Sequence, residues 1–154
     1  REPIEWQIYD VKTTPRGTKY SLVSVDVILA SGERVNKRHV NWKTSAIGMY
    51  IEQEMSDAFT EVEQELLVDV GNMGKFGIPT TADINTFRIE KQCKPSVQIG
   101  ENLKRENGYC NWLVIYNEIS GKASIGCMDF DGKVNRHSKI TGLGIRVTIE
   151  IELP

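Results

Sequence analysis

The chain has 154 residues, of which 40% are hydrophobic and 26% are charged, and its formal net charge is −2. These are the values of an ordinary globular domain, so the composition excludes a chain that is disordered throughout. The slightly acidic balance also excludes a partner held by bulk positive charge alone. The longest apolar runs are far shorter than the roughly 20 residues that a membrane-spanning helix needs. We therefore expect a single globular domain over residues 1–154.

The cysteines argue for a reducing compartment. They are Cys93, Cys110 and Cys127, an odd number with no C-x-x-C spacing, which speaks against both a disulfide framework and a zinc knuckle. The first residues, "REPIEW", contain no initiating Met and are not a secretory signal. We expect that an N-terminal tail precedes them.

Two strands are predicted near the N-terminus. Apolar and polar residues alternate over 4–9 and again over 19–30, which is the pattern of a half-buried strand. Pro15 and Gly17 break the pattern between them and indicate a turn over 13–19.

The next section has the period of a helix. One bent helix over about 44–69, or two consecutive helices, would fit. Ser56 with Asp57, or Thr60 with Glu63 in a capping box, would begin a second helix. The apolar stripe consists of Ile47, Ile51, Met55, Ala58, Val62 and Leu66.

The rest of the chain is rich in strand patterns. We expect a short strand over 85–92 and longer strands over 109–119, 122–130 and 145–153. Because the helical section is inserted once, not alternated with strands, we predict an α+β fold: a mainly antiparallel sheet covered by one long bent helix or two consecutive helices.

The last strand is preceded by a G-x-G sequence, Gly142 to Gly144. A dinucleotide-binding loop would lead into a helix and carry a third glycine, and neither is present. The glycines therefore predict a bend into the strand. The expected outer, solvated row of that strand is Arg146, Thr148, Glu150 and Glu152.

Residues 71–81, "GNMGKFGIPTT", form a predicted loop with an apolar content that loops seldom have. One interpretation is that its apolar side chains anchor the loop on the core. The other is that they are exposed and contact a membrane or a second copy of the protein. In the second case, replacing Phe76 and Ile78 by serine should leave the fold intact and reduce oligomers. The four residues concerned are Met73, Phe76, Ile78 and Pro79.

No catalytic, metal or cofactor site is expected. The histidines, His39 and His137, lie among cations, whereas a metal site or a catalytic base needs carboxylates or thiolates nearby. No nucleophile-elbow, zinc-protease or P-loop motif occurs.

Two basic clusters stand out, over 34–43 and 133–139. They are either ordinary solvated positions or a patch for an anionic partner, such as lipid headgroups or the RNA of a nucleocapsid. Trp42 suits an interfacial position. The charged residues are Arg34, Lys37, Arg38, Lys43, Lys133, Arg136 and Lys139.

The order of these features resembles the rhabdovirus matrix proteins. The pieces that match are "SLVSVDVILASGER" (21–34), "SAIGMYIEQ" (45–53), "NMGKFGIP" (72–79) and "GLGIRVTIEIE" (142–152). In that family an amphipathic strand leads to a helix, a flexible loop follows, and a strand of Gly-Leu-x-Ile-Arg-Val type comes near the end. The chain departs from the pattern in lacking a basic tail and a proline-rich late-domain motif, both of which would lie N-terminal to it.

The resemblance implies a structural viral protein and not an enzyme. Such a protein self-associates in a lattice, bridges membrane and nucleocapsid during assembly and budding, and is found inside the infected cell, peripherally at its membrane and in the virion. It is not secreted. The resemblance assigns the contact with a membrane or a second copy to the four apolar loop residues. The expected partners are a second copy, an anionic membrane surface, and a nucleocapsid or RNA, with no small-molecule substrate. The alternative function is a nucleic-acid-binding module of the RNA-binding or silencing-suppressor type.

Overall fold

The computed structural model describes residues 3–35, 40–96, 103, 105–136 and 142–154. Its helices are η1 (Trp42–Thr44), α1 (Ala46–Ser56), α2 (Glu61–Glu65) and α3 (Thr81–Phe87). Its strands are β1 (Trp6–Thr14), β2 (Gly17–Ser24), β3 (Leu29–Ala30), β4 (Leu67–Val68), β5 (Arg105–Glu106), β6 (Tyr109–Cys110), β7 (Trp112–Ile119), β8 (Lys122–Met128), β9 (Val134–Asn135), β10 (Gly144–Ile145) and β11 (Thr148–Leu153).

The strands form two main sheets, which confirms the α+β fold and its mainly antiparallel pairing. In the described part of the chain, one sheet has the order β1-β2-β11-β4 and the other the order β3-β10-β7-β8-β9. A two-stranded ribbon joins β5 to β6. Among the strand pairs of the described residues, β10–β7 is the parallel one.

The prediction of one long bent helix over about 44–69 was wrong. The section that was expected to be helical contains two short helices, α1 and α2, and the N-cap of α2 is Thr60 and not Ser56. Thr60 and Glu63 form the expected capping box, in which each side chain accepts a hydrogen bond from the other residue's backbone N–H. Gly48 lets α1 start close to η1, because a Cβ at this position would collide with the carbonyl oxygen of Trp42.

Two further strand predictions need correction. Residues 85–92 were expected to form a strand. The first three of them instead belong to α3, which follows the capping residue Thr80 and ends at Phe87. The strand expected over 19–30 ends at Ser24, and the chain then crosses to the other sheet, where it forms β3. A strand that crosses between sheets keeps its apolar alternation, so the pattern alone does not reveal the break.

The closing segment crosses between sheets in the same way. β10 belongs to the five-stranded sheet and β11 to the four-stranded sheet. At the crossing, Arg146 and Thr148 are buried, at 1% and 0% exposure, so the predicted solvated row is wrong at these two positions. The G-x-G sequence is a bend, as predicted: Gly142 has a φ of 66°, and a Cβ on Gly144 would collide with the side chain of Val27.

Both faces of the five-stranded sheet are buried at its centre. Leu113 and Ile115 face a cluster that includes Trp42 and the apolar side of α1. Trp112 and Val114, which alternate with them, face a second cluster that includes Ile84 of α3. The near-continuous apolar run of β7 is explained by this double burial.

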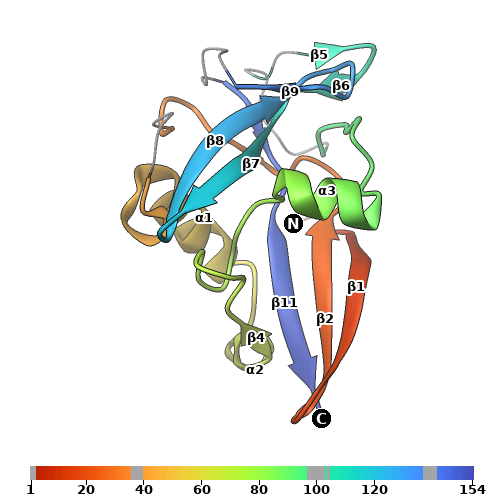
Figure 1. Ribbon diagram of the computed structural model, residues 1–154, viewed down its shortest axis with the longest axis vertical. Helices are drawn as coiled ribbons and strands as arrows, with labels where there is room; N and C mark the ends of the chain where they lie inside the picture. The colour runs from red at the N-terminus through yellow and green to blue at the C-terminus, as the bar shows by residue number, and fades with distance from the viewer. Residues whose placement is uncertain (1–2, 36–39, 97–102, 104, 137–141) are drawn as a thin grey trace.

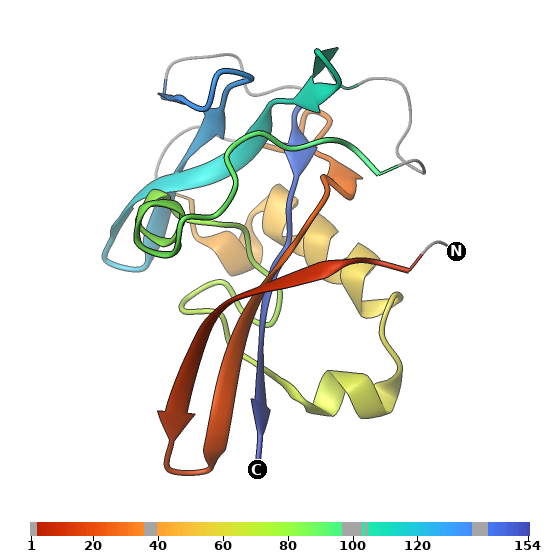
Figure 2. The ribbon, with the colours of Figure 1, turned by 90° about the vertical axis from the view of Figure 1, so that its right-hand side faces the viewer.

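The four-stranded sheet extends beyond this core. In both ribbon views, β1, β2 and the end of β11 project away from the rest of the molecule, and the C-terminus lies near the tip (Figures 1 and 2). We call β1, β2 and β11 together the arm. A two-residue turn, Pro15-Arg16, joins β1 to β2 at the tip, where Thr14 pairs with Gly17. A Cβ on Gly17 would collide with the carbonyl oxygen of Leu153, which explains the glycine.

Candidate interaction surfaces

The apolar loop is buried, so its assignment as an exposed contact with a membrane or a second copy was wrong. Ile78 is 0% exposed, Phe76 3% and Met73 7%, and Pro79 is also buried. The interpretation in which the loop anchors itself on the core is the correct one.

The loop is buried because it joins the two sheets. Gly77 exchanges backbone hydrogen bonds with Thr148 of β11, at 3.0 and 2.9 Å. Three residues later, Thr80 pairs with Ile115 of β7. The indole N–H of Trp42 donates to the carbonyl oxygen of Phe76 at 3.4 Å. A segment held at both ends by sheet pairing has its side chains directed into the space between the sheets.

The basic clusters are described in part. Lys37, Arg38, His39, His137 and Lys139 lie outside the described residues. Of the others, the guanidinium groups stack on tyrosine rings: Arg34 lies over Tyr50 at 3.8 Å and Arg136 over Tyr116 at 4.8 Å. Lys43 and Lys133 are exposed.

The two clusters adjoin the same edge of β8. Ala123 pairs with Glu118 of β7 on one side and with Val40 on the other. Cys127 likewise pairs with β7 on one side, and on the side of Val40 it pairs with Asn135 of β9. Val40 and Asn135 therefore lie on one edge about 13 Å apart, at ~3.3 Å per residue. Neither Trp42 nor Trp112 is available to an RNA base there, because their exposures are 2% and 0%.

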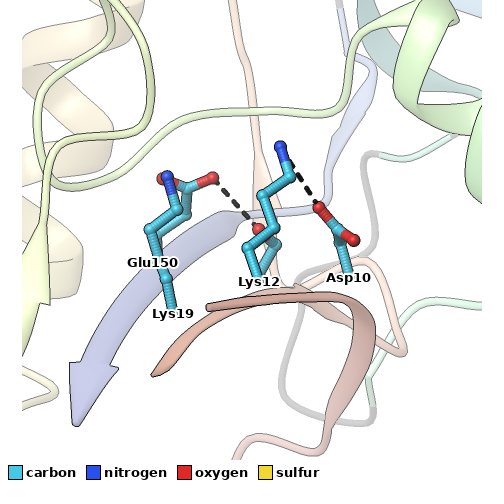
Figure 3. A network of polar contacts seen from close by, with 5 residues as sticks. Asp10, Lys12, Lys19 and Glu150 are labelled. Carbon is cyan, nitrogen blue, oxygen red and sulfur yellow. Dashed lines mark hydrogen bonds and ion pairs between the residues drawn. The ribbon is translucent and has the colours of Figure 1, made fainter. Parts of the chain in front are cut away.

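One face of the arm is polar. Lys19 and Ser21 on β2 both contact the carboxylate of Glu150 on β11, at 3.6 and 3.0 Å (Figure 3). On β1, Lys12 lies 3.5 Å from Asp10. The charged groups of this face are therefore paired largely with one another.

The opposite face of the arm is apolar and half open. Ile8 lies opposite Leu22, and Val11 lies opposite Tyr20, so these four side chains share a face. The two on β1 are 53% and 55% exposed. Among the described residues, β1 has no neighbouring strand on its outer edge. An unpaired edge strand with exposed apolar side chains is a common site of association.

A groove adjoins the base of this apolar face. Its volume is about 610 Å³, which lies in the range of binding pockets. Trp6, two residues from Ile8 on the same face of β1, stands at its edge 6.2 Å from the ring of Phe59. We call it the acidic groove, because its charged lining residues are Glu5, Asp26, Glu54 and Glu63, with no Lys or Arg among the described lining residues.

A second pocket, of about 350 Å³, contains the buried Arg146. Its guanidinium donates to the carbonyl oxygens of Glu90 at 2.7 Å, Ser24 at 3.0 Å and Val25 at 3.4 Å. It also lies over the ring of Trp112 at 4.9 Å. These contacts tie three segments together and give Arg146 a structural role.

The thiol beside Arg146 is not a nucleophile. Burial raises the pKa of Cys93 to about 11, and the attraction of Arg146 offsets this only in part. The thiol is therefore protonated at neutral pH, whereas the reactive form of a cysteine is the thiolate. The pocket offers no activated group from this residue.

The described residues contain no group of three or more His, Cys, Asp or Glu placed to hold a metal ion. Within the same residues, no helix has the length and apolar character needed to cross a membrane.

The sequence did not reveal the arm or the acidic groove. The alternation over 4–9 and the turn after it indicated a hairpin, but not that β1 would be an edge strand. The four carboxylates of the groove come from positions 5 to 63, and only the fold brings them together. Comparisons of this chain with protein-family models, with curated proteins and with solved structures found no match, so its resemblance to the rhabdovirus matrix family stays a prediction.

Proposed function

We propose that this protein is a non-catalytic assembly protein that associates with copies of itself through the arm. The observation that carries the proposal is the half-open apolar face of the arm beside the unpaired edge of β1. Burial of such a surface stabilises an association by about 25 cal/mol per Å², before the entropic costs of binding are subtracted. The apolar loop that was first assigned to this role is replaced by Ile8 and Val11.

Within this proposal, a viral matrix-type role remains the specific form that the sequence resemblance supports. Copies joined through their arms would build the lattice that such a role needs. The basic edge of β8 would face the anionic partner, either a membrane surface or a nucleocapsid.

The variant Ile8→Lys tests the proposal. A lysine at this half-exposed edge position is tolerated in the free chain, but in an association through the arm it would be buried without a partner, which costs several kcal/mol. We expect the dissociation constant from sedimentation velocity to rise at least about tenfold, which is ~1.4 kcal/mol.

The matched control is Ile119→Lys. Ile119 is also an isoleucine on a strand, and its exposure of 54% is close to the 53% of Ile8, but it lies at the end of β7. We expect the control to associate as the parent protein does. Equal association of parent and Ile8→Lys, with matching melting curves, would exclude the arm as the contact.

A second candidate function is RNA binding at the outer edge of β8. The observation in its favour is that both basic clusters adjoin this edge, one through Val40 and the other through β9. Lys133 and Arg136, on either side of β9, are exposed, as are Arg34 and Lys43 of the other cluster. The burial of both tryptophans speaks against base stacking, so phosphate contacts would have to supply the affinity.

A salt titration of single-stranded RNA binding tests this candidate. Each phosphate contact contributes about −0.7 to the slope of log K against log salt concentration. The pair Lys133→Gln and Arg136→Gln should therefore make the slope less negative by about 1.4, whereas the control pair Lys12→Gln and Lys75→Gln should not change it. Absence of binding by the parent protein at low salt would remove the candidate.

A further inference from the structure

We propose that the acidic groove of one copy receives the tip of the arm of a second copy. The inference rests on the proposed self-association and names the two surfaces that meet. The contact joins two different surfaces, so a pair of copies still has one free arm and one free groove for further neighbours.

The charges of the two surfaces are complementary. The tip, residues 11–19, contains Lys12, Arg16 and Lys19 and no acidic residue. Lys19 is paired with Glu150, and Lys12, whose side chain is 62% exposed, lies 3.5 Å from Asp10, so the arm itself partly neutralises these two cations. Arg16, at the turn, is exposed, and no ion pair to it is found among the described residues. Among the described lining residues, the charged groups of the groove are all carboxylates.

The apolar parts of the two surfaces are also matched. Val11 is 55% exposed on the apolar face of the arm, opposite the face that carries Lys12 and Lys19. Ile28, Met55 and Phe59 also line the groove. A segment that carries both long cationic side chains and an apolar side chain suits such a lining, because the cations reach the rim while the apolar group is removed from water.

The arm cannot fill the groove of its own chain. Trp6 lines the groove, and the tip begins to turn at Thr14, eight residues further along the same extended strand. At ~3.3 Å per residue the two lie about 26 Å apart. The occupant must therefore come from another molecule. The projection of the arm from the body gives the tip the access that such an insertion needs (Figures 1 and 2).

The geometry of the contact has a consequence for the assembly. A contact between two different surfaces produces closed rings or open arrays, whereas a contact between identical surfaces stops at a dimer. Association through the arm and the groove would therefore continue beyond two copies. It would also weaken as salt is added, because its charges lie at exposed positions.

The test uses charge reversal on each surface in the full chain. The groove variant carries Glu5→Lys and Glu54→Lys, and the arm variant carries Lys12→Glu and Arg16→Glu. Each variant alone brings like charges together, so we expect at least a tenfold rise in the dissociation constant in sedimentation velocity. The matched control, Glu52→Lys with Glu118→Lys, makes the same charge change at exposed positions outside the groove.

Mixing the two variants distinguishes this contact from every other. In the mixture, the unchanged arm of one variant meets the unchanged groove of the other, and the two reversed surfaces also match. We expect association to return to within about threefold of the parent, with both variants in equal amounts in the complexes. Each variant's melting curve reports whether it is folded.

The outcomes separate the inference from the proposed function. If the parent associates and both variants associate equally well, the arm does not enter the groove. The same follows if mixing the variants does not restore association. In either case the proposed self-association stands. If the parent stays monomeric at every concentration, both are overturned. If only the arm variant weakens association, the arm meets a different surface and the groove is excluded.

Discussion

The double replacement Phe76→Ser and Ile78→Ser is expected to unfold the protein. The sequence pattern alone predicted the opposite, a folded chain with fewer oligomers. The exposures of these side chains are 3% and 0%, and the ring of Phe76 packs 5.7 Å from that of Phe59. Removing a buried Phe or Ile side chain costs about 2–5 kcal/mol, and the two costs together approach the 5–15 kcal/mol that stabilises a whole domain.

Urea unfolding monitored by tryptophan fluorescence provides the measurement, because both Trp42 and Trp112 are buried. The control exchanges the exposed residues of the same loop, Asn72→Ser and Lys75→Ser, and should shift the unfolding midpoint little. A double variant with an unchanged midpoint would show that the loop is exposed after all, and the loop would again be a candidate contact.

Replacing Arg146 by methionine is expected to lower the free energy of unfolding by about 3–5 kcal/mol, because buried carbonyl oxygens lose their donors at about 1–3 kcal/mol each. The change removes a buried charge together with the hydrogen bonds to the carbonyl oxygens of Ser24, Val25 and Glu90. Hydrogen bonds to charged groups contribute about 1.5–3 kcal/mol each, and the carbonyl groups left behind would be unsatisfied. Burial lowers the pKa of the guanidinium, so the three acceptors are needed to stabilise its charge.

Two companion variants make this result specific. Arg146→Lys keeps the charge but not the planar fork of donors, so we expect it to be nearly as destabilised as the methionine variant. Arg16→Met makes the same chemical change at the exposed turn of the arm and should alter stability by less than ~0.5 kcal/mol. A loss below about 1 kcal/mol for Arg146→Met would mean that the guanidinium is not a structural tie.

The basis of these two predictions differs. The sequence shows that the loop is apolar, but it does not show whether these side chains face the core or the solvent. Met73 and Phe76 suit an exposed contact as well as a core anchor, and the pairing of Gly77 with β11 decides between them. Arg146 was placed on a solvated row because it alternates with Ile145 and Val147. The chain changes sheets at that point, so its side chain is enclosed from both sides.

The sequence by itself determined the class of the fold, two strands joined by a turn near the N-terminus, the capping box at Thr60 and the bend at Gly142. Each depends on contacts between neighbours in the chain, which local patterns record. Only the tertiary structure decided that the apolar loop is buried, that the arm exposes Ile8 and Val11, and that distant carboxylates share a groove. These features depend on which strand lies at the edge of a sheet and where the chain crosses between sheets. Such pairings join residues far apart in sequence, and the period of the side chains does not encode them.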